Sequence, residues 1–82
     1  MHQFRTLASL EEGESARVQS LHHNGAVRRR LQDIGLTEHA SVQCVQKSPS
    51  GEIAAYRIRG AVMALRQADA VLIAISKEES PF

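Results

Sequence analysis

Tryptophan is absent from the 82-residue sequence, and Cys44 is its single cysteine. A disulfide within the chain is therefore impossible, which excludes a disulfide-stapled secreted fold. Aromatic residues make up 4% of the chain, so a core must be largely aliphatic and few side chains are available to stack on nucleic-acid bases. No apolar run is long enough for a signal peptide or a membrane span. We expect a cytoplasmic domain without a cofactor.

The chain also lacks an excess of charge of either sign. Ten Lys and Arg residues stand against nine Asp and Glu residues, a net charge of +1. No global field then steers the protein towards nucleic acid or anionic lipid, so any electrostatic recognition must be local. A chain of this length forms one core and has no cleft between domains. We predict a single domain over residues 1–76 and a flexible tail over residues 77–82.

One short helix is predicted within the stretch NGAVRRRLQDIGL. Asn24 is of a type that caps helix N-termini, because its side-chain oxygen can accept a hydrogen bond from a free amide of the first turn. Val27, Leu31 and Ile34 are spaced so that they share one face, which we expect to be buried. Gly35 can adopt the left-handed conformation that ends a helix. A helix this short needs packing against other elements to be stable.

The remaining apolar patterns predict short strands. The strand segments are 14–21 with one irregularity, 41–47, 53–59, 62–66 and 71–75. A type I turn is predicted over Ser48–Gly51, where proline is second and glycine fourth. A single turn of helix is expected near residues 6–13 and another over residues 67–70. Five strands with one helix between the first two predict a mainly β fold, a small antiparallel barrel.

Three consecutive arginines lie on the predicted helix. Planar guanidinium groups suit an acidic patch on a partner protein, so we predict a partner-binding surface formed by Arg28, Arg29, Arg30 and Asp33. The alternative is a solvated helix face whose charges are satisfied by Asp33, Glu14 or water. A charge reversal that leaves partner binding intact would favour that alternative.

Metal-ligating and catalytic patterns are weak. The chain has four histidines, at positions 2, 22, 23 and 39, and no carboxylate at the spacing of a facial metal site, so we predict no metal site. Cys44 occupies an apolar strand position and is expected in the core rather than as a nucleophile. Because no other catalytic set can be recognised, we predict that the protein is not an enzyme.

Four stretches together resemble a known family. They are LASLEEGESARV, GAVRRRLQDIGL, VQCVQKSPSGEIAAYRIRG and MALRQADAVLIAI, which cover nearly the whole chain. The order is similar to that of FeoA proteins of bacterial ferrous iron uptake, and to the SH3-like module of iron-dependent repressors of the DtxR type. One departure lies after the "GL" of the helix, where the family usually has a glycine and this chain has Glu38 and His39.

The resemblance implies an SH3-like barrel that acts as a binding module. It also implies a partner, the FeoB-type membrane iron permease with its GTPase domain, whose iron transport the protein would modulate. Two alternatives remain open. One is a metal-sensing or regulatory domain related to the repressors, and the other is an RNA-binding barrel that uses Arg57 and Arg59 together with the helix arginines. The side chains expected mainly in the core, or else in a peptide groove beside the helix, are Tyr56, Ile58, Met63 and Leu65.

Overall fold

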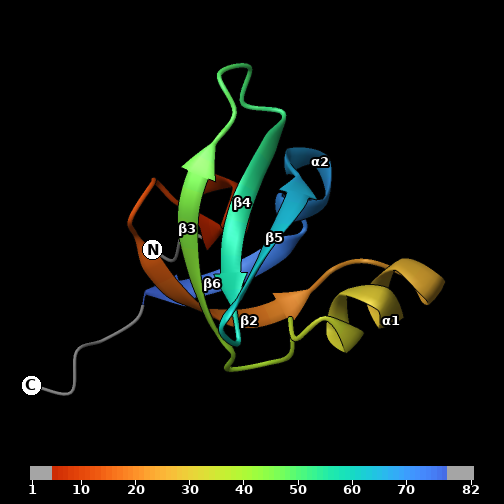
Figure 1. Ribbon diagram of the computed structural model, residues 1–82. Coiled ribbons are helices and arrows are strands. Elements are labelled where there is room, and N and C mark those ends of the chain that lie inside the picture. Colours follow the sequence, from red (N-terminus) through yellow and green to blue (C-terminus); the bar gives the residue numbers. More distant parts are fainter. Residues whose placement is uncertain (1–4, 78–82) are drawn as a thin grey trace, which may run out of the picture.

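Six strands form one antiparallel sheet in the computed structural model, which describes residues 5–77 (Figure 1). The elements in chain order are β1 (Arg5–Thr6), the 3₁₀ turn η1 (Leu7–Ser9), β2 (Ser15–Leu21), α1 (Gly25–Asp33), β3 (Ser41–Lys47), β4 (Ile53–Ile58), β5 (Ala61–Arg66), α2 (Gln67–Ala70) and β6 (Ile73–Lys77). The strand order is β1-β6-β2-β3-β4-β5, so β1 and β5 are the two edges of a sheet that does not close.

The predicted mainly β, antiparallel fold is confirmed, with two differences in detail. Residues 5–77 contain six strands rather than five, because Arg5 and Thr6 of β1 pair with Ile75 and Ala74 of β6. The helix therefore follows the second strand instead of the first. The two described residues of β1 carry no recognisable alternation of polar and apolar side chains, which is why the sequence did not indicate this strand.

Local predictions within the sheet are largely confirmed. β2 contains the expected irregularity, a register shift between Val18 and Ser20 in its pairing with β6. The turn between β3 and β4 is closed by a hydrogen bond from the amide of Gly51 to the carbonyl oxygen of Ser48 (2.9 Å). The predicted single turns correspond to η1 and α2.

The last strand was predicted two residues too early, over residues 71–75. Val71 is 50% exposed and Leu72 is 42% exposed, and the strand begins only at Ile73. The amide of Val71 donates to the carbonyl oxygen of Gln67 (3.0 Å), so Val71 still belongs to the end of α2. The continuous apolar run thus includes two residues of the connection between α2 and β6. The predicted tail, apart from Lys77 at the end of β6, lies outside the described residues.

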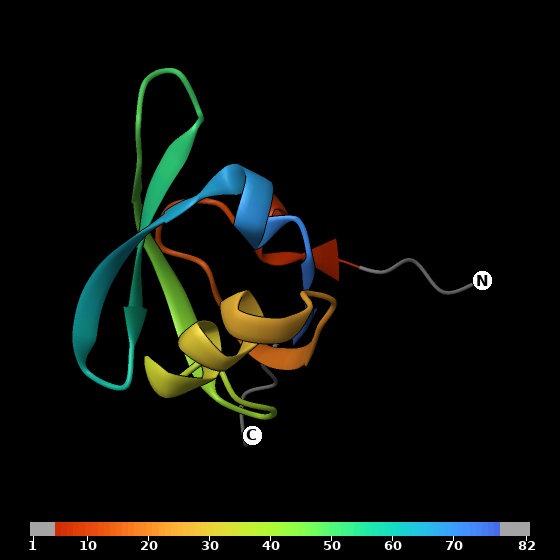
Figure 2. The ribbon, with the colours of Figure 1, turned by 90° about the vertical axis from the view of Figure 1, so that its right-hand side faces the viewer.

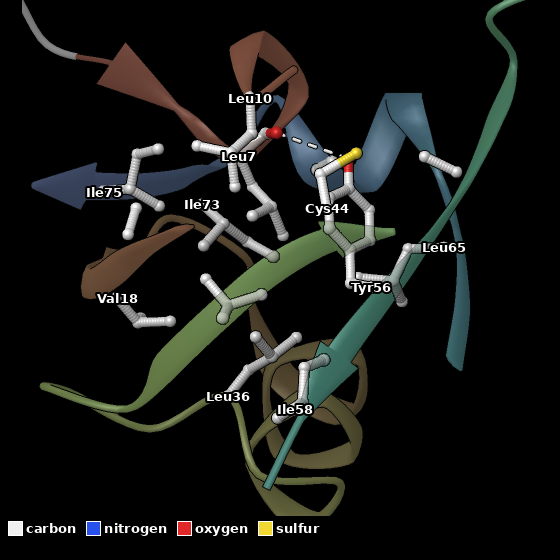
Figure 3. Packing of buried hydrophobic residues seen from close by; sticks show 14 of the residues in the cluster. Leu7, Leu10, Val18, Leu36, Cys44, Tyr56, Ile58, Leu65, Ile73 and Ile75 are labelled. Atoms are coloured by element: carbon white, nitrogen blue, oxygen red, sulfur yellow. Dashed lines mark hydrogen bonds between the residues drawn. The ribbon is translucent and has the colours of Figure 1, made fainter. Parts of the chain in front are cut away.

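The core lies inside the curled sheet and is almost entirely aliphatic (Figure 3). Tyr56 is its largest fully buried side chain, and Cys44 beside it is also buried. The alternation predicted for β4 is confirmed, since Ala54, Tyr56 and Ile58 are buried while Arg57 is exposed. η1 contributes Leu7, which lies at one end of the core.

The helix α1 ends as predicted but is less buried than predicted. The amide of Leu36 donates to the carbonyl oxygen of Leu31 (3.0 Å), and that of Gly35 donates to Gln32, the pair of bonds that defines a Schellman motif. Leu31 and Leu36 are buried, and Ile34 is partly buried. Val27, by contrast, is 45% exposed, so the prediction of a wholly buried face was wrong.

The position of α1 explains this error. The helix stands at the side of the sheet, with β5 as a neighbour, and is not packed across the sheet (Figure 2). Within the helix only Leu31 is buried, and the Schellman motif folds Leu36 back onto the core. Asn24 does occupy the N-cap position, yet its side chain makes no capping hydrogen bond.

Candidate protein-docking surface

The arginine ridge, which consists of Arg28, Arg29 and Arg30, lies on the exposed surface of α1. No carboxylate of residues 5–77 lies within 4.0 Å of these guanidinium groups, and Glu14 pairs with Arg5 (3.2 Å) instead. Glu14 therefore does not neutralise the ridge. The three guanidinium groups form no ion pair with another described residue, which fits both a partner-binding surface and the alternative of a helix face solvated by water.

Asp33 lies beside two of the three predicted arginines. It lines a shallow depression of about 520 Å³ with Arg29 and Arg30, near the start of the helix at Gly25. Arg28 does not line that depression. Helical spacing places residues three and four positions apart on one face, which is why the acid lies beside Arg29 and Arg30. Three of the four predicted site residues, Arg29, Arg30 and Asp33, thus share one depression, and Arg28 lies outside it.

A groove between α1 and β5, here called the α1–β5 groove, was considered from the sequence only as an alternative. It has a volume of about 620 Å³. Its lining residues are Val27, Arg30, Leu31, Ile34, Met63, Ala64, Leu65, Arg66 and Asp69. The lining is apolar along both elements, with two arginines and one aspartate at its charged positions. Arg30 belongs both to the arginine ridge and to this groove.

Of the apolar side chains predicted to lie either in the core or in a peptide groove, some are buried in the core and one is only partly buried, in the α1–β5 groove. Tyr56 and Leu65 are buried, with exposed fractions of 0% and 8%, so their predicted core role is confirmed. Met63 is only partly buried and lines the α1–β5 groove together with the exposed Val27. The apolar strip beside the helix that would favour a peptide groove is therefore present, although it is built from Met63 and Val27.

The histidines do not gather into a site. His22 is exposed and its Nε2 lies 3.2 Å from the hydroxyl of Ser20. His23 was expected in an exposed loop but is buried (6% exposed), with its Nε2 3.0 Å from the carbonyl oxygen of Asp69. A carbonyl only accepts, so Nε2 carries the proton, and the buried Nδ1 has no partner among the described residues. Within residues 5–77, no three His, Cys, Asp or Glu residues lie close enough together to hold a metal ion.

Cys44 occupies the core position that the sequence predicted. Burial raises the pKa of its thiol, which keeps it protonated and poorly nucleophilic. Burial likewise raises the pKa of the Tyr56 hydroxyl, although the hydrogen bond from Gln67 acts against this rise. Both groups therefore serve packing and hydrogen bonding in the neutral form.

The remaining basic residues of interest lie elsewhere. Arg57 and Arg59 line a separate depression of about 460 Å³ with Ser15 and Gln43, across the outer face of the sheet. This depression shares no lining residue with the one beside the arginine ridge. No helix within residues 5–77 has the length and apolarity required to cross a membrane.

These features define a small SH3-like protein with one helix inserted after its second strand. Its fold is shared with a manganese-dependent transcriptional repressor at a TM-score of 0.82 and 15% identity, over 95% of this chain and 44% of that one. At that identity the likeness concerns the fold alone. No curated protein sequence matches the chain.

The chain belongs to the FeoA family, since the FeoA domain family model matches residues 5–77. The FeoA protein of Chlorobium tepidum is 31% identical, with a TM-score of 0.82 over 87% of this chain and 68% of that one. The FeoA of Stenotrophomonas maltophilia, solved with zinc and described as an SH3 domain protein, is 33% identical, with a TM-score of 0.74 over 88% and 89%. The family is linked to ferrous iron transport, and the predicted resemblance is confirmed.

Proposed function

We propose that the protein is a cytoplasmic accessory protein of bacterial ferrous iron uptake, which binds the FeoB-type permease and modulates iron transport. Membership of the FeoA family supports the pathway. The observation that supports a docking role is the arginine ridge, whose exposed guanidinium groups have no carboxylate within 4.0 Å among the described residues. Such cations are free to form bidentate hydrogen bonds with carboxylates of a partner.

The surroundings of the arginine ridge and the state of the thiol favour docking over catalysis. The depression lined by Arg29 and Arg30 is shallow, and the only thiol of the chain is buried with a raised pKa. Arg28, Arg29, Arg30 and Asp33 would contact an acidic surface of the permease or of its GTPase domain.

A binding titration tests this proposal. The purified protein is titrated against the detergent-solubilised permease and against the isolated GTPase domain, each with and without ferrous ion. We expect saturable binding that weakens strongly in the Arg28→Glu/Arg29→Glu variant. Arg57→Glu makes the same kind of charge change at an exposed strand residue, away from the ridge, and is expected to bind like the unmodified protein.

The same titration addresses the two alternatives. If the folded protein binds neither permease nor GTPase domain, the accessory role is wrong. Calorimetric titration with ferrous, manganous and zinc ions then tests the metal-sensing function. The reason to test it is that the Stenotrophomonas maltophilia relative was solved with zinc. A salt-dependent affinity for RNA would instead support a nucleic-acid function.

A further inference from the structure

We propose that the α1–β5 groove receives an extended acidic segment of the partner protein, which adds to the sheet as a further strand beside β5. This inference rests on the proposed function and supplies its mode of binding. It differs from docking on the arginine ridge alone, because recognition here involves the backbone of β5 as well as side chains.

The register of β5 shows which of its backbone groups are free to bind. The amide of Gln67 donates to the carbonyl oxygen of Glu52 (2.8 Å), and the β4–β5 pairing continues from there without a register shift. Hydrogen-bonded pairs alternate along an antiparallel ladder. Leu65 and Met63 therefore direct their backbone groups at β4, whereas those of Ala64 and Val62 face the open edge. Within residues 5–77, β4 is the one strand that pairs with β5.

This edge has few of the features that normally prevent strand addition. β5 is six residues long, contains no proline, and pairs regularly along its whole length. Its only charged residue is Arg66, at the end of the strand. Natural edges are usually protected by lysine, proline, bulges or short length.

The groove provides room for the side chains of an added strand. A strand lies about 4.8 Å from its neighbour, and its alternate side chains point to opposite faces. Apolar side chains on one face of the added segment would enter the space between Val27 and Met63, whose volume is about 620 Å³. The 45% exposure of Val27, an apolar residue predicted to be buried, fits a surface that a partner covers.

Charge complementarity specifies an acidic segment. Arg30 and Arg66 line the groove, against the single acid Asp69. Neither arginine has a carboxylate within 4.0 Å among the residues described. A segment with apolar side chains on its groove-facing side and a Glu or Asp at its ends would place those carboxylates near the two guanidinium groups.

Peptide binding with amide hydrogen exchange tests the inference. Fluorescein-labelled synthetic peptides of overlapping sequence, covering the cytoplasmic segments of the permease, are titrated against the full-length protein, and the intact permease is titrated in parallel. We expect one acidic peptide to bind saturably and to slow the exchange of the Val62 and Ala64 amides. The amides of Met63 and Leu65, already bonded to β4, should change less.

A proline substitution tests the contribution of the backbone. Ala64→Pro removes the outward amide, and we expect it to weaken peptide binding about tenfold, as the loss of a hydrogen bond requires. Circular dichroism checks that the variant folds. If Ala64→Pro does not fold, Val27→Asp tests the groove, with Val45→Asp as the control at an exposed valine that does not line the groove.

The results distinguish this inference from the proposed function. If the permease binds but no peptide protects the Val62 and Ala64 amides, or if Ala64→Pro or Val27→Asp binds normally, strand addition is wrong and the accessory role stands. If neither permease nor peptide binds, both fail. A protein dimer that protects the same two amides without any peptide would also overturn the inference, because a second copy would then be the occupant.

Discussion

The hydroxyl group of Tyr56 in β4 donates a hydrogen bond to the carbonyl oxygen of Leu7 in η1, over 3.3 Å. The side-chain amide of Gln67 in α2 donates to the same hydroxyl oxygen over 2.9 Å. Tyr56 is fully buried, so one side chain connects the N-terminal turn, the sheet and α2 inside the core (Figure 3). The only tyrosine of the chain thus has a structural role.

Replacement of this tyrosine with phenylalanine tests that role. Tyr56→Phe keeps the ring but leaves the carbonyl oxygen of Leu7 and the amide of Gln67 without their partner. Because a lost buried hydrogen bond costs about 1–2 kcal/mol, we expect the free energy of unfolding to fall by that amount. Urea denaturation measures it. In the Gln67→Ala background the loss should be smaller, and an unchanged stability in Tyr56→Phe would show that these bonds contribute nothing.

A side chain at the position of Gly35 is expected to lower the stability of the protein. The φ of Gly35, 112°, disfavours any side chain, and a Cβ atom there would lie 2.9 Å from Cδ of Arg59 and 3.0 Å from Cγ2 of Ile58. We expect Gly35→Ala to lower the free energy of unfolding by about 2–3 kcal/mol, from backbone strain and crowding together. Thermal denaturation followed by circular dichroism measures the change.

Gly13→Ala is the matched control for this prediction. Gly13 also has a positive φ, 87°, but a Cβ atom there meets nothing within 4 Å. It should therefore cost only the strain of the left-handed conformation, about 1 kcal/mol. Equal losses in the two variants would mean that the close approach to Ile58 and Arg59 is relieved without cost.

Replacement of His39 with glycine is expected to raise the stability of the protein. His39 adopts a φ of 72°, at the position where the sequence departs from the glycine usual in the family. The departure leaves the turn in place and puts a non-glycine residue in the left-handed region. His39→Gly should raise the free energy of unfolding by about 0.5–1 kcal/mol. Glu38→Gly, at an adjacent position without a positive φ, should lower it, and a destabilised His39→Gly would show that the imidazole itself is needed.

The sequence predicts what depends on neighbouring residues. The end of α1 at Gly35, the irregularity in β2 and the alternation around Tyr56 all follow from local patterns, and the structure confirms them. Burial of Val27 and exposure of His23 were predicted wrongly, because both depend on where α1 and α2 settle relative to the sheet. Helical spacing identifies a face but not whether another element covers it.

The candidate site divides in the same way. The arginine ridge is visible in the sequence because Arg28, Arg29 and Arg30 are consecutive on a predicted helix. The α1–β5 groove joins residues from segments more than thirty positions apart, such as Ile34 and Leu65. The free edge of β5 depends on the order of strands, which the sequence alone does not give.

The buried thiol of Cys44 makes the free energy of unfolding depend on pH in alkaline solution. Burial raises the pKa of its thiol above the ordinary value of 9.0. Below about pH 8 the thiol is protonated in both folded and unfolded chains, so its ionisation does not change the free energy of unfolding. Above pH 9.0 the unfolded chain releases the proton while the folded chain retains it, so the free energy of unfolding falls as pH rises. Urea denaturation across this range measures the decline.

The Cys44→Ala variant identifies the contribution of the thiol. It should be less stable at neutral pH because it leaves a small cavity, but its stability should decline less steeply above pH 9.0. The buried hydroxyl of Tyr56, whose pKa is also raised, is retained in the variant and accounts for a remaining decline at higher pH. A native thiol that reacts with a disulfide reagent as fast as the unfolded chain would contradict this account, because such a thiol is not protected by the core.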